Sequence, residues 1–198
     1  MEKHFNVFVV LYDNFTALDA IGPVEVLGRV SNSVRFVSLK GGTIENRQGV
    51  RILTETFDRI EKGSILLIPG GTGSRTVIKD GDFIRELGKA IEDSEYTLCV
   101  CTGSALAAET GLMDGKKATS NKSAWGWVTD NHPNVLWNKM ARWVADGKFY
   151  TSAGVSAGID MALGFVNDRL GPEAAEEICR MLEYHWNSNP DHDSFGME

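Results

Sequence analysis

The stretch YTLCVCTGSALAAETG, residues 96–111, joins an apolar run to a run of small residues with helical spacing. Residues 96–100 predict a strand buried on both faces, because their apolar side chains do not alternate with polar ones. Residues 103–112 predict a helix. Cys101 lies between the two elements, just before Gly103 and Ser104. A sharp strand-to-helix turn with small residues resembles the nucleophile elbow of hydrolases, so we expect it to present the Cys101 side chain.

Strands and helices alternate along the rest of the chain. Further buried strands are predicted at 5–12, 34–39 and 64–71. Other helices are predicted at 17–30, 82–93, 122–130, 155–169 and 172–186. Hairpins are predicted at 43–55 and at 142–153. This order predicts an α/β fold with an open, mostly parallel sheet, helices on both faces, and sites at the carboxyl ends of the strands.

Composition limits the class of protein. With 198 residues, 42% of them hydrophobic and 24% charged, the chain is expected to form one domain over 1–188 and a polar tail over 189–198. The net charge of -7 argues against a nucleic-acid surface. No apolar run is long enough for a membrane span, and the N-terminal one is too short for a signal peptide. We therefore expect a cytoplasmic protein with no nucleic-acid or membrane partner.

The three cysteines are Cys99, Cys101 and Cys179, and their spacing fits neither a zinc site nor a C-x-x-C motif. They predict reduced thiols and no bound metal. Cys99 and Cys179 are expected in the core, and core packing is also the alternative for Cys101. As a nucleophile, Cys101 would be favoured by the positive end of the following helix. Lowering a thiol pKa from about 8.5 to about 5.5 takes roughly 4 kcal/mol, so a second group must contribute.

Five stretches occur in a fixed order along the chain: ALDAIGPVEVL (17–27), IPGGTG (68–73), VCTGSALAAETGLMDGKKAT (100–119), TSAGVSAGIDMAL (151–163) and LEY (182–184). In this combination the chain resembles the ThiJ/PfpI superfamily of class I glutamine amidotransferase-like proteins, most closely its isonitrile (isocyanide) hydratase branch. The resemblance implies one ThiJ/PfpI-type domain with a flavodoxin-like fold and a nucleophile elbow. It also implies a homodimer, a small-molecule substrate, and neither a metal nor an organic cofactor.

The resemblance implies that Cys101 is the catalytic nucleophile, that Asp19 is the carboxyl in contact with it, and that Thr102 places a hydroxyl near the sulfur. A protonated Asp19 could donate a hydrogen bond to a thiolate, whereas an ionised Asp19 would oppose its charge. Judged by its position alone, Asp19 could equally be a cap or an acid in the first turn of a helix.

The resemblance further implies a pocket for an anion or for substrate at Gly70, Gly71, Thr72 and Thr102, with the backbone N–H groups of Gly71 and Thr102 as donors. The segment PGGTGSRT (69–76) lacks the Lys-Ser/Thr pair of a phosphate loop and the third glycine of a dinucleotide fingerprint. Nucleotide binding is therefore not expected. Close approach of the backbone to Cys101 explains these glycines better.

One position departs from the family pattern. The isonitrile hydratase branch often reads A-T-T-H-W after the nucleophile helix, whereas residues 118–122 here are ATSNK, with Asn121 in place of the histidine. Histidine base catalysis from this segment is therefore not expected. The histidines elsewhere are expected to be structural or solvated: His4, His132, His185 and His192. Three aromatic residues are candidates to line an apolar substrate pocket, with core packing as the alternative: Phe15, Trp125 and Trp127.

The activity that the resemblance implies is hydration of an isonitrile by a hydro-lyase, through a covalent thioimidate on Cys101, to give an N-substituted formamide. One alternative is a glyoxalase- or deglycase-like enzyme of the same superfamily, which the missing histidine disfavours. Another is a non-catalytic redox or ligand sensor based on cysteine, because relatives occur fused to DNA-binding segments. A chain of this length leaves no room for such a segment, so direct DNA contact is not expected.

Overall fold

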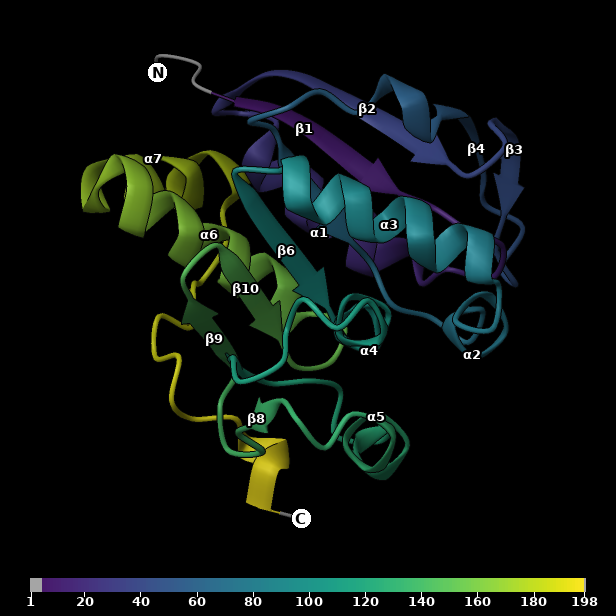
Figure 1. Cartoon of the computed structure of the whole chain (residues 1–198). Coiled ribbons are helices and arrows are strands. Elements are labelled where there is room, and N and C mark those ends of the chain that lie inside the picture. Colours follow the sequence, from purple (N-terminus) through teal and green to yellow (C-terminus); the bar gives the residue numbers. More distant parts are fainter. Residues whose placement is uncertain (1–4, 198) are drawn as a thin grey trace.

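The computed structural model describes residues 5–197 and contains an eight-stranded sheet in the order β3-β4-β2-β1-β5-β6-β10-β9 (Figure 1). Its strands are β1 (Phe5–Val10), β2 (Ser31–Ser38), β3 (Gly42–Glu45), β4 (Arg51–Thr56), β5 (Ile65–Ile68), β6 (Tyr96–Val100), β9 (Trp143–Asp146) and β10 (Phe149–Ser152). Neighbours from β4 to β10 are parallel, and only the edge pairs β3–β4 and β9–β10 are antiparallel. The predicted open, mostly parallel sheet is therefore confirmed.

Helices cover both faces of this sheet, as predicted. They are α1 (Ala17–Leu27), α2 (Ser74–Val77), α3 (Gly81–Asp93), α4 (Gly103–Glu109), α5 (Trp125–Asn131), α6 (Ala157–Leu170) and α7 (Pro172–Leu182). Helices α1 and α6 pack against each other on one face, and α3 and α4 lie together on the other (Figure 1). Strand β1 has β2 on one side and β5 on the other, so the order of strands reverses there. Ligands of open α/β sheets bind at such a reversal, outside the carboxyl ends of the strands.

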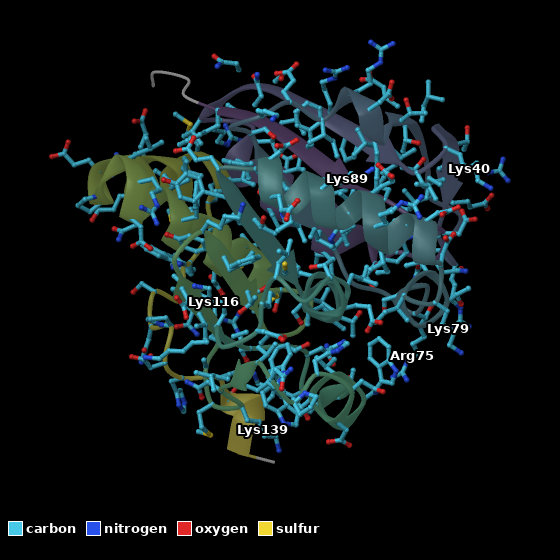
Figure 2. The ribbon with its side chains drawn as sticks, in the orientation of Figure 1. Lys40, Arg75, Lys79, Lys89, Lys116 and Lys139 are labelled. Carbon is cyan, nitrogen blue, oxygen red and sulfur yellow. The ribbon has the colours of Figure 1, made fainter. Side chains whose placement is uncertain are left out.

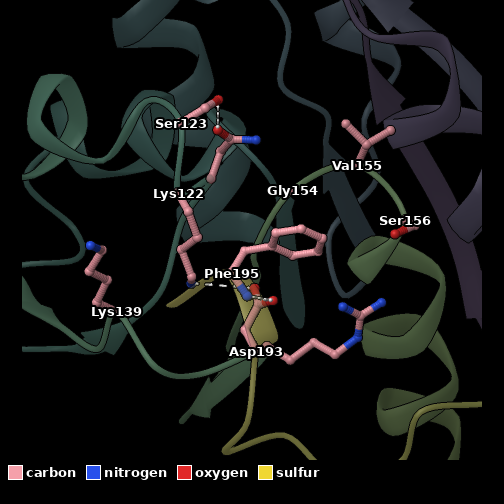
Figure 3. A pocket seen from close by; sticks show the side chains of 10 residues that line it. Lys122, Ser123, Lys139, Gly154, Val155, Ser156, Asp193 and Phe195 are labelled. Carbon is pink, nitrogen blue, oxygen red and sulfur yellow. Dashed lines mark hydrogen bonds and ion pairs between the residues drawn. The ribbon is translucent and has the colours of Figure 1, made fainter. Parts of the chain in front are cut away.

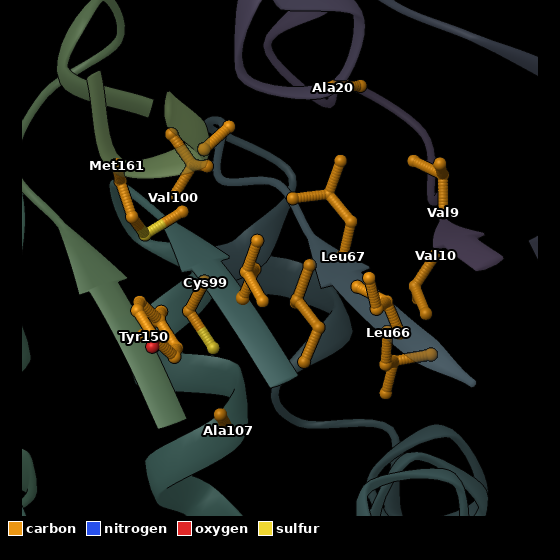
Figure 4. Close-up of a cluster of buried hydrophobic side chains, with 14 of the residues drawn as sticks. Val9, Val10, Ala20, Leu66, Leu67, Cys99, Val100, Ala107, Tyr150 and Met161 are labelled. Atoms are coloured by element: carbon orange, nitrogen blue, oxygen red, sulfur yellow. The ribbon is translucent and has the colours of Figure 1, made fainter. Parts of the chain in front are cut away.

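The central strands are apolar on both faces, which is why their sequences do not alternate. Side chains of Leu67 and Val100 point toward α1 and α6, and those of Leu66 and Cys99 point to the opposite face (Figure 4). All four are fully buried. Cys99 is therefore a core residue, as expected, and burial raises the pKa of its thiol. Cys179 in α7 is half-buried and packs at the edge of the core.

Several predicted boundaries move in the structure. The first helix ends at Leu27 rather than at residue 30, and the last ends at Leu182 because Glu183 adopts a left-handed conformation with φ of 50°. The helix predicted from residue 122 begins at Trp125. The sequence prediction contains no counterpart of α2, of the two-stranded sheet of β7 (Lys117–Ala118) and β8 (Leu136–Trp137), or of the 3-10 helices at Phe57–Arg59 and Ser194–Met197.

The polar C-terminal residues carry structure of their own. The backbone N–H of Arg142 donates to Pro190 O at 2.7 Å, and that of Asp193 donates to Met140 O at 2.7 Å. A 3-10 helix, η2, follows at Ser194–Met197. These bonds hold the end of the chain beside the β9–β10 hairpin.

Charges are spread over the surface. The basic residues labelled in Figure 2 come from separate loops and from two helices, α2 and α3: Lys40, Arg75, Lys79, Lys89, Lys116 and Lys139. None of the helices within residues 5–197 combines the length and apolarity needed to cross a bilayer.

Candidate active site

Cys101 occupies a strained turn between β6 and α4. Its φ is 57°, in the left-handed region that residues other than glycine rarely adopt. Its backbone N–H donates to the carbonyl oxygens of Ser152 (3.2 Å) and Ala153 (3.1 Å), and its own carbonyl accepts from the hydroxyls of Ser104 (2.8 Å) and Ser120 (3.0 Å). These bonds hold both sides of the peptide, so the predicted elbow is present and fixed.

Glycines bring the neighbouring loop against this turn. A Cβ atom on Gly103 would lie 2.1 Å from Ile68 O, and one on Gly70 would lie 2.6 Å from Thr102 N. Neither distance is possible for real atoms, so both positions require glycine. The end of β5 and the start of α4 therefore meet backbone to backbone, as expected from the glycines after Pro69.

Asp19 lies in the first turn of α1 and is fully buried beside Cys101. Its Oδ2 accepts from Gly70 N at 3.0 Å. The other oxygen, Oδ1, is buried with no conventional partner among the described residues, and the Cys101 side chain is near enough to hydrogen-bond the carboxyl. Asp19 does not cap α1 with its side chain. The Asp19 carboxyl instead contacts Gly70 and Cys101 at the elbow.

Burial controls the protonation of Asp19. Removal from water raises the pKa of its carboxyl to about 7, although the Gly70 N–H and the Cys101 side chain both favour the charged form. An acid with this pKa gains or loses its proton easily near neutral pH. Asp19 is therefore suited to proton transfer with the adjacent thiol.

The thiol pKa of Cys101 is raised overall, because burial outweighs the stabilisation of the thiolate expected at the start of α4. The residue is only 6% exposed, and its burial, followed by the charge of Asp19, raises the pKa of Cys101 to about 12. Hydrogen bonds from the Thr102 backbone, the Thr102 hydroxyl and the Asn121 amide favour the thiolate but do not offset this. Cys101 therefore rests as a thiol, and its ionisation needs a base.

Residues expected around an anion pocket meet at the same place, but their donors are engaged within the protein. The N–H of Gly70 donates to Asp19, and the N–H of Gly71 donates to Thr102 Oγ1 at 3.0 Å. Ser74 Oγ also donates to Thr102 Oγ1 at 3.1 Å. Thr72 is exposed. Sequence reasoning did not find Ser74, although it lies within the glycine-rich segment.

Asn121 stands beside the sulfur in a fixed orientation. Its Oδ1 accepts from Ser123 Oγ at 2.6 Å and from Ala124 N at 3.0 Å. The amide nitrogen Nδ2 is thereby turned inward, where it lies 2.8 Å from the position of a Cβ atom on Gly154. The residue in place of the family histidine thus supplies a neutral hydrogen-bond donor to Cys101.

A cavity of about 370 Å³ opens beyond Asn121 and Gly154 (Figure 3). Its lining comes from three distant parts of the chain: Asn121, Lys122, Ser123, Lys139, Arg142, Gly154, Val155, Ser156, Asp193 and Phe195. Two lining residues connect this cavity to the elbow: Asn121 hydrogen-bonds the Cys101 side chain, and Gly154 follows Ala153, whose carbonyl oxygen accepts from Cys101 N. Cys101 itself does not line the cavity.

The aromatic residues that the sequence offered for a substrate pocket lie elsewhere. Phe15 is buried in the core. Trp127 lies under the guanidinium of Arg75 at 4.5 Å, and Trp125 packs edge to face on Trp137. Core packing therefore describes Phe15, whereas Trp125 and Trp127 are half-buried, and none of the three lines the cavity beyond Asn121.

The histidines within the described residues lie away from Cys101. His132 is buried 3.8 Å from Glu109, and burial lowers its pKa. His185 and His192 are exposed, and His4 lies outside the described residues. Within residues 5–197, no three His, Cys, Asp or Glu side chains are grouped so as to hold a metal ion.

Comparisons with known proteins show the family of the chain. Residues 5–168 match the DJ-1/PfpI family. The chain is 28% identical to isonitrile hydratase from Pseudomonas putida, over 88% of this chain and 76% of that protein. It is 25% identical to protein DJ-1 homolog B from Arabidopsis thaliana and to an HTH-type transcriptional regulator from Pseudomonas aeruginosa. The matches cover 88% and 87% of this chain but only 40% and 53% of those proteins.

Solved structures of a ThiJ/PfpI family protein and of a DJ-1 protein superpose well on this chain. A ThiJ/PfpI family protein from Pseudomonas syringae superposes with a TM-score of 0.85 at 25% identity, covering 98% of this chain and 79% of that one. Drosophila melanogaster DJ-1beta superposes with a TM-score of 0.80 at 22% identity, covering 94% of this chain and all of that one. The second likeness concerns the fold alone.

Proposed function

The chain belongs to the DJ-1/PfpI family, and we propose that within it the protein is a hydro-lyase that adds water to an isonitrile to give an N-substituted formamide. The observation that carries the proposal is the buried Cys101–Asp19 pair, a nucleophile beside an acid whose pKa is about 7. The similarity to an isonitrile hydratase supports the choice of substrate.

The first step joins substrate and enzyme. Ionised Asp19 takes the proton of the Cys101 thiol while the sulfur attacks the terminal carbon of R–NC, forming a C–S bond. Asp19 then returns this proton to the same carbon, which gives the thioimidate R–N=CH–S–Cys101. Because an isonitrile carbon accepts both the sulfur and the proton, this step needs no histidine base.

The second step releases the product. Water adds to the thioimidate carbon as Asp19 moves one of its protons to the nitrogen, giving R–NH–CH(OH)–S–Cys101. Asp19 then takes the hydroxyl proton while the C–S bond breaks, so R–NH–CHO leaves and the sulfur recovers its proton from Asp19. Hydrogen bonds from Thr102 and Asn121 to the sulfur favour its departure as a thiolate. The sum of both steps is R–NC plus water giving the formamide.

A non-catalytic sensor is the second candidate. The similarity to a transcriptional regulator favours it. The near-complete burial and raised pKa of the Cys101 thiol argue against oxidation as its signal, since oxidants react with exposed thiolates. A glyoxalase-like activity is disfavoured by Asn121 in place of a histidine.

We also propose that the protein acts as a homodimer. Leu18, next to Asp19 on α1, is a large apolar side chain with 44% of its surface exposed, which is consistent with a partner at this helix. Sedimentation at micromolar concentration distinguishes dimer from monomer.

The enzyme proposal is tested by turnover. Wild type should convert benzyl isonitrile to N-benzylformamide, detected by NMR, and Cys101→Ala should abolish the reaction with an unchanged circular dichroism spectrum. Methylglyoxal is assayed in parallel as the substrate of the glyoxalase-like alternative. Formamide production by Cys101→Ala at the wild-type rate would contradict the proposal, and a wild type inactive on isonitriles would favour the sensor.

A further inference from the structure

The cavity beyond Asn121 has one wall that comes from C-terminal residues, Asp193 and Phe195. Phe195, in η2, is 62% exposed, and Figure 3 places its ring between Lys122 on one side and Val155 on the other. An exposed phenylalanine is unfavourable in water unless something covers it. A ring held at the mouth of a cavity is therefore available to a ligand.

The backbone around this ring is anchored. Asp193 N donates to Met140 O at 2.7 Å, Phe195 N donates to Asp193 Oδ1 at 3.2 Å, and Gly196 N donates to Asp193 O at 2.8 Å. A Cβ atom on Gly196 would lie 2.6 Å from Lys139 O, so the chain passes too closely there for any other residue. The backbone that carries the ring is thus held in place before a ligand arrives.

A buried ion pair ties this wall to the residues that touch the sulfur. Asp193 Oδ2 lies 3.8 Å from Lys122 Nζ, and both side chains are almost completely buried. Lys122 Nζ also donates to Thr119 Oγ1 at 2.8 Å and to Ala141 O at 2.9 Å. Lys122 follows Asn121 in the chain. The ion pair with Asp193 therefore connects the C-terminal residues to the residue whose amide hydrogen-bonds Cys101.

Two of the three cations that line the cavity, Lys122 and Arg142, are paired with carboxylates of the protein, and the third is Lys139. Lys122 faces Asp193, and Arg142 makes two contacts with Asp160 Oδ2, at 2.7 Å and 2.5 Å. Neither of these buried cations needs an anionic ligand. The remaining inner surface includes the Phe195 ring and Val155.

We propose that Phe195 is a specificity-determining residue, whose ring packs against the organic group of a substrate that has its reactive carbon at Cys101. This inference rests on the proposed function and narrows its substrate to isonitriles with a neutral aromatic or bulky apolar group. A cavity of about 370 Å³ holds a group of that size.

Turnover of two isonitriles tests this directly. In Phe195→Ala, KM should rise about tenfold more for benzyl isonitrile than for methyl isonitrile, because only the benzyl group reaches the ring. The matched control is Leu53→Ala, which removes a side chain 78% exposed on β4 and should leave both KM values unchanged. An equal change for both substrates in Phe195→Ala overturns the inference, as does a lower wild-type KM for isocyanoacetate than for benzyl isonitrile.

A second measurement separates this inference from the proposed function. The ratio of Cys101 alkylation rates with N-benzyl-2-chloroacetamide and 2-chloroacetamide is determined by mass spectrometry in wild type and Phe195→Ala. The ratio should fall about tenfold in the variant, since the same ring contacts the benzyl group. An unchanged ratio overturns the role of Phe195 even if isonitriles turn over. If the ratio falls but the protein hydrates no isonitrile, the role of Phe195 in binding the benzyl group stands and the proposed hydratase activity is wrong.

Discussion

Asp19 and Cys101 are buried together, and removal from water is the main cause of the raised pKa of each side chain. The helix that follows Cys101 can be predicted from the sequence, and so can its stabilisation of a thiolate. The degree to which the fold removes water from Cys101 and Asp19 cannot. The helix end is a local feature, whereas burial comes from α1, the Gly70–Gly71 backbone and Asn121, which are distant in sequence. Consequently the residues of the pair could be named from the sequence motifs, but the location of their proton could not.

The burial of Asp19 has a measurable consequence for stability. Its folded pKa of about 7 lies above the unfolded value of 3.8, so its contribution to stability is complete below about pH 3.8 and is lost as the pH rises through 7. Asp19→Asn keeps an acceptor for Gly70 N and never ionises. Urea unfolding should give similar stabilities near pH 4 and a more stable variant near pH 8, by up to about 4 kcal/mol. An equal difference at both pH values would show that Asp19 does not carry the titration.

The strand–turn–helix elbow around Cys101 can be predicted from the residues near it in the sequence. Apolar strands and the small residues after Cys101 predict the turn, and the glycines predict close approach. The short elements α2, β7 and β8 were not predicted, because two to four residues carry too little periodicity to be distinguished from a loop. Ser120, which braces the Cys101 carbonyl, lies just after β7 and was missed for the same reason.

Close packing at the elbow predicts a large effect of one methyl group. Gly103→Ala places a Cβ atom against Ile68 O, so the start of α4 must move away from β5, which should cost about 1–3 kcal/mol and most of the activity. Gly88→Ala, within α3, meets nothing closer than 3.7 Å and should instead stabilise by about 0.5–1 kcal/mol. Thermal unfolding of both variants checks this, and a Gly103→Ala protein as stable and active as wild type would rule out the tight contact.

At the scale of the whole molecule, the site is assembled from segments that the topology brings to one end of the sheet. Asp19 follows β1, Gly70 follows β5, and Cys101 follows β6, which is the arrangement that a parallel sheet imposes. The C-terminal wall is different. Asp193 and Phe195 lie in a polar sequence without periodicity, and only their contacts with Lys122 and Met140 in the folded chain give them a place beside the cavity.

The role of Asp19 as the base that ionises Cys101 is measured by kcat/KM for benzyl isonitrile between about pH 5 and pH 9, in wild type and Asp19→Asn. The wild-type value should rise with pH through about 7 and then level, because ionised Asp19 must take the proton of a neutral Cys101 thiol. Asp19→Asn should lose this rise and about 10²–10⁴ of the rate. A wild-type rate independent of pH across this range, or a fully active Asp19→Asn, would contradict the account.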